Sequence, residues 1–355
     1  MGQEPRLAVP QETEGLSAEP SHAAGVEADH VAGLVDVIVP VFNKRPFLEA
    51  SLGSILRAAG PSRIARVTVL DHGSTDGSLE LGIALCRGRA RHLVLSGGTI
   101  ATLRNAGARE SDRPILSFLD ADCVVPPGYF EALCRVMANP EVAATGRRVD
   151  YPTDGSWVER TWHAMHHSAS EGFRQYLNSG NFAIRRDVFE RFGGFAEALI
   201  SGEDSELGQR LNDGGFRIWE SADLPVVHLD NPQSLVGFFR KEVWHAKGML
   251  ATRRAWPPHL PLIGAALHAL FLVAAGFWLA QSTGTLWVRL AVTFGLVSVV
   301  PVLAVMYRAL PQRRRVPWIH ATVLYQAYLL ARITALAVAP MSQRRRRKAA
   351  GLTNA

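Results

Sequence analysis

The spacing of hydrophobic residues changes twice along this 355-residue chain. Residues 1–33 contain few large apolar side chains and predict a disordered segment, because they cannot bury enough surface to offset chain entropy. They also lack the basic start and apolar core of a signal peptide. Residues 34–252 alternate short apolar runs with amphipathic stretches, which predicts a folded domain. From residue 257 to 340 the apolar runs become long enough for a membrane region, and a basic tail follows at 341–355.

Short apolar runs and helical spacing alternate in the first half of the folded domain. The predicted strands are 34–40, 64–70, 91–95 and 115–119, and the predicted helices are 46–59, 78–86 and 99–108. This alternation indicates an α/β fold with a mostly parallel sheet covered by helices on both faces.

The second half of the domain is less regular. Its predicted strands are 142–149, 182–184, 216–219 and 226–228, and its predicted helices are 157–167, 186–192, 205–213 and 235–250. The helix over 205–213 is expected to begin directly after the acidic pair Glu203–Asp204.

Two uncharged or nearly uncharged apolar runs, at about 260–280 and 286–306, are long enough to cross a bilayer. Arginine pairs or triplets flank them, at Arg253–Arg254 before the first run and Arg313–Arg315 after the second. Because cytoplasmic loops carry an excess of positive charge, these flanks predict a multi-pass protein of the cell (inner or plasma) membrane with the α/β domain in the cytoplasm.

A third apolar segment, 318–339, contains His320, Gln326 and Arg332. If it spanned the bilayer, the basic tail at 341–355 would lie outside, against the charge rule. We therefore expect an interfacial or re-entrant helix, and a third span is the alternative.

The net charge of +6 is concentrated beside these apolar segments, at Arg313–Arg315 and Arg344–Lys348. This placement favours attraction to a membrane surface over nucleic-acid binding, which needs basic and aromatic residues interleaved on a folded face. The three cysteines, Cys86, Cys123 and Cys134, are odd in number and lack metal-ligand spacing, so we expect reduced thiols in a cytosolic domain.

Two carboxylates at positions i and i+2, Asp120 and Asp122, follow the predicted strand 115–119. Both can turn toward one divalent cation at the carboxyl edge of the sheet, where open α/β sheets bind ligands. Oxygen-rich sites of this kind suit Mg2+ or Mn2+ that bridges phosphate oxygens. A pair of acids in a solvated loop is the alternative reading.

A second carboxylate at the end of a predicted strand is that of Asp71, in the run Asp71–Ser78 that leads into a helix. The Asp71 carboxylate is placed to accept hydrogen bonds from a nucleobase or ribose. The alternative is a surface turn, in which Gly73 and Gly77 permit tight bends and a polar side chain caps the helix.

Five short motifs occur in a specific order: Val39–Asn43, Asp71–Asp76, Arg104–Gly107, Leu119–Asp122 and Gly202–Asp204. Together they resemble the family 2 glycosyltransferases, which are inverting enzymes of the GT-A fold that use nucleotide-diphosphate sugars. The resemblance covers roughly residues 35–250.

The resemblance implies a role for each matching position. It implies nucleotide-sugar contacts for Pro40, Phe42, Asn43, Asp71, Arg104, Asn105, Asp120, Gly180 and Asn181, metal ligation by Asp120, Asp122 and His228, and catalysis by Asp204 beside Glu203. Asp204 takes the proton of the acceptor in this scheme, while the acidic pair also suits a helix N-terminus. The alternative to metal ligation by His228 is a buried histidine with a structural role. On the helix 235–250, there are two readings of the basic residues: they bind a phosphate of the donor or of a lipid, or they face the membrane without a catalytic role.

Two positions depart from the family pattern. Lys44 follows Asn43 where relatives often have an acid, and His72 follows Asp71 where they often have a second aspartate. We expect these changes to tune base or sugar preference without removing a metal ligand or base.

The resemblance predicts a membrane-anchored enzyme that transfers a sugar from a nucleotide-diphosphate sugar to a hydroxyl of a lipid-linked or cell-surface glycan precursor. Two or three spans are too few to form a channel for polymer export. A nucleotidyltransferase on a related fold and a nucleotide-sugar-binding pseudoenzyme are the alternatives. The first lacks a Gly-rich triphosphate loop, and the second does not explain why Asp120, Asp122 and Asp204 are all present.

Overall fold

The structure is a computed structural model that describes residues 34–60, 64–166, 171–251, 260–310 and 316–349. Several predicted features lie outside these residues, namely the disordered segment 1–33, the arginines at 253–254 and 313–315, and the end of the tail at 350–355.

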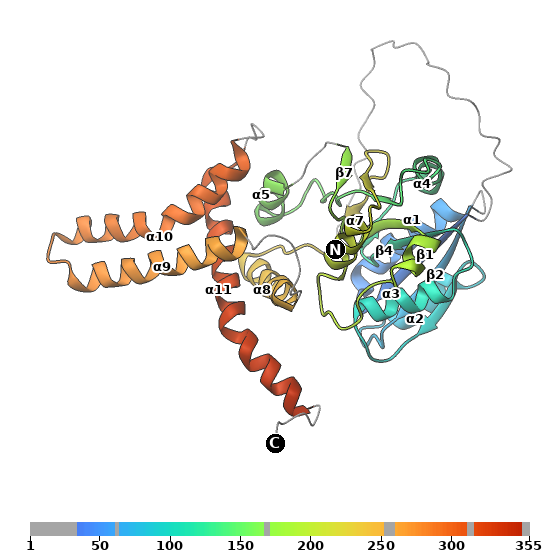
Figure 1. The fold of residues 1–355 in the computed structure, drawn as a ribbon, viewed down its shortest axis with the longest axis horizontal. Coiled ribbons are helices and arrows are strands. Elements are labelled where there is room, and N and C mark those ends of the chain that lie inside the picture. The colour runs from blue at the N-terminus through green and yellow to red at the C-terminus, as the bar shows by residue number, and fades with distance from the viewer. Residues whose placement is uncertain (1–33, 61–63, 167–170, 252–259, 311–315, 350–355) are drawn as a thin grey trace, which may run out of the picture. The chain divides into compact units, whose positions relative to one another are not determined.

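An eight-stranded sheet with the order β3-β2-β1-β4-β8-β6-β9-β7 organises the domain (Figure 1). Its strands are β1 (Val35–Val41), β2 (Ala65–Asp71), β3 (Arg91–Val94), β4 (Ile115–Leu119), β6 (Ala144–Gly146), β7 (Gly172–Arg174), β8 (Asn181–Arg185) and β9 (Ile218–Glu220). The first four strands are parallel, β8 runs antiparallel to β4 and β6, and β7 runs antiparallel to β9. The predicted mostly parallel α/β sheet is confirmed, and its reversed strands lie in the irregular second half.

Helices cover both faces of this sheet. The helices α1 (Arg45–Ala59), α2 (Ser78–Cys86) and α4 (Tyr129–Met137) contribute to one buried apolar cluster, while α3 (Ile100–Arg109), α6 (Arg186–Arg191) and α7 (Glu203–Asp213) contribute to the other. Along β1, Val37 and Val39 belong to the first cluster and Ile38 to the second. Because both faces are buried, the strand is apolar on both faces except for the buried Asp36.

Several elements differ from the predictions. β6 spans three residues rather than 142–149, and its last residue, Gly146, packs so closely on β8 that an added Cβ would clash with the Asn181 carbonyl oxygen. α7 begins at Glu203, two residues earlier than predicted, after Gly202 with φ 83°. A second sheet pairs β5 (Cys123–Val124) with β10 (Val227–His228), and neither β5 nor β7 is long enough to show a pattern.

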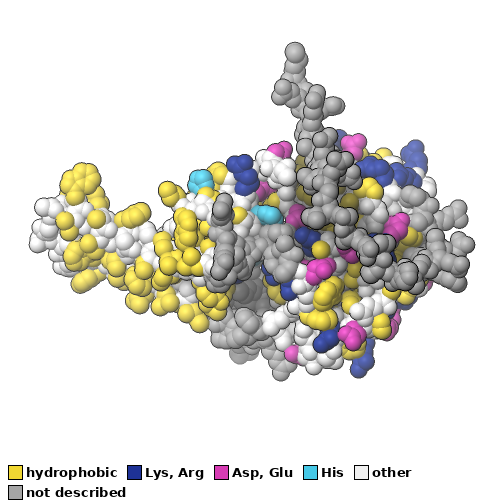
Figure 2. All heavy atoms as spheres, turned by 90° about the horizontal axis from the view of Figure 1, so that it is seen from above, with side chains coloured by type: hydrophobic (Ala, Val, Ile, Leu, Met, Phe, Trp, Pro, Cys, Tyr) yellow, Lys and Arg dark blue, Asp and Glu magenta, His cyan; other side chains and the backbone are white. Residues whose placement is uncertain are grey.

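The C-terminal part consists of α8 (Leu235–Ala251), α9 (Leu260–Gln281), α10 (Leu286–Ala309) and α11 (Trp318–Ala349). Within the described residues, α9, α10 and the Trp318–Val338 part of α11 are long and apolar enough to cross a membrane. Hydrophobic side chains gather over α9 and α10 with few charged ones among them (Figure 2), and Phe277, Trp287 and Phe294 are largely exposed. Exposed apolar surface of this extent indicates membrane association.

The third apolar helix, α11, differs from the other two. Its mean hydropathy is 1.4, against 2.1 for α9 and 2.2 for α10, and 44% of its most apolar window is buried, compared with 17% for each of the others. It packs on α8 and α5 (Trp157–His166), and Arg332 on α11 pairs with Glu242 on α8 at 2.6 Å. Both side chains are less than 10% exposed.

Candidate active site

The carboxyl edge of the parallel strands gathers most of the predicted site. β1, β2 and β4 end at Val41, Asp71 and Leu119, and β8 begins at this edge because it is antiparallel, with Asn181 opposite Leu119. The loops that follow β4 and precede β8 therefore meet, and the Asp120 amide donates to the Gly180 carbonyl at 3.3 Å.

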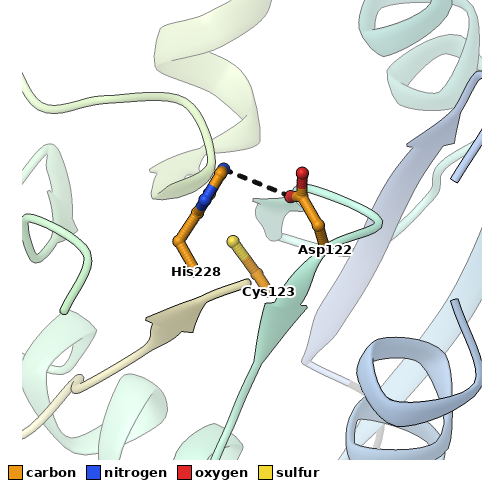
Figure 3. A group of neighbouring side chains, drawn as sticks. All are labelled: Asp122, Cys123 and His228. Atoms are coloured by element: carbon orange, nitrogen blue, oxygen red, sulfur yellow. Dashed lines mark ion pairs between the residues drawn. The ribbon is translucent and has the colours of Figure 1, made fainter. Parts of the chain in front are cut away.

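Asp122, Cys123 and His228 form a compact cluster (Figure 3), in which one candidate ligand atom of each lies within 4.8 Å of the others. The β5–β10 pairing sets Cys123 opposite His228, and this brings the His228 Nε2 to 3.3 Å from the Asp122 Oδ1. Asp122 is 2% exposed. Among the described residues, neither Asp122 Oδ1 nor His228 Nδ1 makes a hydrogen bond.

This cluster fits a divalent cation. A buried carboxylate oxygen without a hydrogen bond costs free energy unless a ligand satisfies it. Burial lowers the pKa of His228 despite the opposing charge of Asp122, and this favours the neutral imidazole that binds metals. Burial and the nearby carboxylates Asp120 and Asp122 raise the pKa of the Cys123 thiol, so the thiol stays protonated and the oxygen and nitrogen donors remain as ligands.

A lysine that the sequence analysis did not place in the site lies directly on Asp122. The Lys44 ammonium is 2.6 Å from Asp122 Oδ2 and 2.5 Å from Asp230 Oδ2. Burial opposes the charged form, but Asp122 and Asp230 outweigh it and raise the pKa of Lys44. The sequence carries a signal for Asp230 that went unused: it follows His228 at the same i, i+2 spacing that joins Asp120 and Asp122.

Arg104 joins Asp120 to Glu203. Its guanidinium is buried and donates to Asp120 Oδ1 and to Glu203 Oε1, both at 2.6 Å. Burial opposes ionisation, but Asp120 and Glu203 raise the pKa of Arg104, and the same pairing with Arg104 lowers the pKa of Asp120 against the effect of burial. The Ser179 hydroxyl also donates to Glu203 Oε1, at 3.3 Å. The Glu203 carboxylate is therefore already paired within the fold.

Asp204 lies beside this network but is not part of its ion pairs. It occupies the first turn of α7, is partly exposed, and accepts a hydrogen bond from the Ser205 amide at 2.7 Å. Burial and the negative charge of Glu203 raise the pKa of Asp204 to about 6. A carboxylate with this pKa can accept a proton near neutral pH.

Asp71 has one occupied and one free carboxylate oxygen. It is fully buried at the end of β2, and its Oδ1 accepts from the Ser74 amide at 2.7 Å. Its Oδ2 is buried without a hydrogen-bond partner among the described residues. The free oxygen fits the predicted contact to a nucleobase or ribose.

The loop after β1 lies beside Asp71. Phe42 is 53% exposed, and its ring meets that of His72 edge-on at 5.6 Å. Asn43, with φ 51°, accepts from the Thr75 amide at 2.9 Å and so ties the two loops together. Pro40 is buried within β1 and shapes the strand end rather than the exposed surface.

Two predicted binding residues have their side chains engaged within the fold. The Asn105 amide donates to the Phe195 carbonyl at 2.8 Å, and its oxygen accepts from the Phe195 amide at 2.9 Å. Asn181 is fully buried, accepts from the Tyr129 hydroxyl and donates to the Leu224 carbonyl. Gly180 does face the site, since an added Cβ would lie 2.7 Å from Asp120 Oδ2.

Residues 36–197 match the protein family described as Glycosyl transferase family 2. This segment, residues 36–197, is a family 2 glycosyltransferase domain. Among curated proteins, the glycosyltransferase AglE of Haloferax volcanii is 29% identical over 225 residues, which cover 59% of this chain and 74% of AglE. The succinoglycan biosynthesis protein ExoA of Rhizobium meliloti is 25% identical over 281 residues, covering 73% of this chain and 84% of ExoA. The pre-mycofactocin glycosyltransferase of Mycobacterium tuberculosis is 28% identical over 261 residues, or 70% of this chain and 54% of that protein.

Among solved structures, the mannosyltransferase PcManGT from Pyrobaculum calidifontis, in complex with GDP-Man and Mn2+, is similar with a TM-score of 0.58 and 21% identity over 87% of each chain. This likeness supports the GT-A fold for the glycosyltransferase domain.

The matched segment of the glycosyltransferase domain ends before three of the candidate residues. Asp71, Arg104, Asp120 and Asp122 lie within residues 36–197, whereas Glu203, Asp204 and His228 follow it. The Arg104–Glu203 ion pair and the 3.3 Å approach of His228 Nε2 to Asp122 Oδ1 join these later residues to the matched part. The chain thus contains a family 2 glycosyltransferase domain, and the candidate site includes residues beyond the matched segment.

Proposed function

We propose that the chain is a membrane-anchored, metal-dependent inverting glycosyltransferase. It transfers a sugar from a nucleotide-diphosphate sugar to a hydroxyl of a lipid-linked or cell-surface glycan precursor. The observation that carries the proposal is the Arg104 bridge, because it links the metal-side acid Asp120 to the acidic pair that contains Asp204. The family match and the naming of ExoA for succinoglycan biosynthesis support the class of reaction and of acceptor.

Asp122 and His228 are the proposed metal ligands, with Asp120 close to them. A divalent cation at this position would neutralise charge that develops on the departing diphosphate. Mg2+ and Mn2+ both suit these oxygen and nitrogen donors, and the Mn2+ in the PcManGT structure supports a divalent metal. Asp71, with its free Oδ2, and the exposed ring of Phe42 are placed to hold the nucleoside.

Asp204 is the proposed general base. Its carboxylate takes the proton as the acceptor O–H bond breaks, and the acceptor oxygen forms the new bond to the anomeric carbon. The bond from that carbon to the diphosphate breaks with its electron pair going to the diphosphate, so a single displacement inverts the centre. Glu203 does not share this task, because Arg104 and Ser179 already hold its Oε1; it raises the pKa of Asp204 instead.

The decisive experiment is a screen of nucleotide sugars for release of nucleoside diphosphate by the purified full chain, with Mn2+, Mg2+ or EDTA. We expect release with one donor, its loss in EDTA, and its loss in Asp122→Ala. Pyrophosphate as product would instead identify a nucleotidyltransferase, and nucleotide binding without turnover would identify a pseudoenzyme. Full-speed transfer by EDTA-treated or Asp122→Ala protein would contradict the proposed metal chemistry.

The anchor is proposed to hold the domain at the cytoplasmic face of the cell membrane. Exposed apolar side chains on α9 and α10 support the attachment, and the basic flanks in the sequence support the orientation. Attachment keeps the enzyme near a membrane-bound acceptor and raises the effective concentration of each for the other.

A further inference from the structure

Lys44 is positioned where its charge affects the proposed metal site most strongly. Its ammonium joins two carboxylates from different segments, Asp122 after β4 and Asp230 after β10, at 2.6 and 2.5 Å. The Lys44 side chain is 26% exposed, whereas that of Asp122 is 2% exposed. The positive charge therefore lies within a partly buried site, where water and salt screen it less than at the surface.

The two oxygens of Asp122 have different surroundings. Oδ2 is occupied by Lys44, while Oδ1 faces the His228 imidazole and makes no hydrogen bond. A divalent cation on Oδ1 and the ammonium on Oδ2 would share one carboxylate and repel each other at close range. Asp122 and Asp230 together carry two negative charges against the three positive charges of a divalent cation and the ammonium, so binding of a free cation to this site is opposed.

A nucleotide diphosphate changes this balance because it brings its own negative charge. Its phosphate oxygens can bind the cation and can also form an ion pair with the ammonium. Lysine is suited to such a transfer, since its charge is carried on a flexible four-carbon chain with three donors. The Asp230 side chain is 46% exposed and is therefore the more exposed of the two carboxylates that hold the ammonium.

We propose that Lys44 keeps the Asp122 site closed to a free divalent cation and moves to the donor's diphosphate when the two arrive together. Metal and nucleotide then bind cooperatively. This inference rests on the proposed function, because it requires a diphosphate donor. Lys44 is a positioning residue in this scheme, and the coupling is reciprocal: the nucleotide strengthens metal binding as much as the metal strengthens nucleotide binding.

The test is Mn2+ binding to the full chain in detergent, followed by electron paramagnetic resonance of the free ion, without nucleotide and with UDP or GDP. For the native protein we expect Mn2+ affinity to rise at least about tenfold when the matching nucleotide is added. In Lys44→Met, removal of the neighbouring positive charge should tighten Mn2+ binding without nucleotide by about tenfold and reduce the effect of the nucleotide.

Two further variants act as controls. Lys44→Arg keeps the charge and should keep Mn2+ binding weak without nucleotide, which separates charge from any general change in the fold. Arg45→Met removes the same charge from the next residue, whose exposed side chain donates to the Gly77 carbonyl, and should leave Mn2+ affinity unchanged.

The outcomes separate this inference from the proposed function. If Mn2+ binds with nucleotide but Lys44→Met leaves its affinity without nucleotide unchanged or weaker, the role of Lys44 is wrong and the metal site stands. If Mn2+ binds to neither protein under any condition while transfer proceeds, the metal-dependent function itself is wrong.

Discussion

Asp204 and Glu203 show how much two adjacent carboxylates can differ. Glu203 is buried and paired with Arg104, whereas Asp204 has no ion pair among the described residues and has its pKa raised to about 6 by burial and by Glu203. The α7 N-terminus favours negative charge at both positions. Pairing therefore decides which of the two can take a proton during the reaction.

The raised pKa gives a pH dependence whose direction is fixed. Asp204 must be ionised to act as a base, so kcat/KM for the acceptor should be low below pH 6 and rise with pH through about 6. Steady-state rates measured over a pH series at saturating donor concentration show this rise of kcat/KM with pH. A rate that falls as pH rises through this range would show that the essential group acts as an acid.

Removal of the Asp204 charge should separate chemistry from binding. Asp204→Asn should lower kcat by at least about 100-fold, because general-base catalysis typically contributes that much, and leave nucleotide affinity nearly unchanged. Transfer assays and nucleotide titration measure the two effects. Asp213→Asn, an exposed change at the other end of the same helix, should alter neither. Strong loss of nucleotide affinity in Asp204→Asn would reassign the residue to binding.

Arg104 is the residue on which the site depends most for stability. Arg104→Met would leave two carboxylates close together without their shared counter-charge, so we expect a loss of about 3–5 kcal/mol in the free energy of unfolding. Denaturant unfolding measures it. The matched control is Arg186→Met, which breaks an exposed pair with Glu190 and should cost less than about 1 kcal/mol. Equal losses in the two variants would contradict the assigned role of Arg104.

At the scale of elements, the sequence predicted the strand ends well because parallel buried strands leave a strong apolar signal. Asp71 and Asp120 were placed at the site for this reason, and the structure brings them to one edge. The hydrogen bonds that Asn105 and Asn181 make within the fold could not be predicted, since an amide that ties loops together and an amide that contacts a ligand are the same residue in a sequence. The Lys44–Asp230 pair depends on the pairing of β10 with β5, and β5, with two residues, is too short to leave a pattern.

The pairing of α8 with α11 gives a second stability prediction. Arg332→Met leaves Glu242 buried without its partner and should destabilise the protein by about 3–5 kcal/mol. The double variant Arg332→Met with Glu242→Met should recover most of that loss, because two apolar side chains replace a buried pair at little cost. Thermal unfolding of the three variants in detergent measures the coupling, and purely additive losses would contradict it.

At the scale of the whole molecule, the contrast between α11 and the other two apolar helices bears on membrane topology. α9 and α10 expose apolar side chains widely, while α11 is packed on α8 and carries a buried ion pair. α11 also packs on α9 and α10, so the buried Arg332–Glu242 pair is the feature that favours the membrane interface over its centre. The sequence alone left an interfacial helix and a third span open because composition does not show what a helix packs against.

An interfacial α11 places the C-terminal tail and the loop between α9 and α10 on opposite sides of the membrane. A cysteine at Thr283, which is exposed between these helices, should react with an impermeant maleimide in intact cells. A cysteine at Thr353 should react only after permeabilisation. The native protein, whose cysteines are buried or partly buried, is the background control. Labelling of both introduced cysteines in intact cells would indicate a third span.

The free oxygen of Asp71 has a consequence for selectivity. A ligand that brings an N–H or O–H donor to Oδ2 gives this buried acceptor a hydrogen bond. A ligand that brings an acceptor or a methyl group leaves Oδ2 without one. The difference is about 1–3 kcal/mol, or roughly five- to 150-fold in affinity. At the proposed nucleoside site, Asp71 should therefore discriminate against nucleosides that bring no donor to Oδ2.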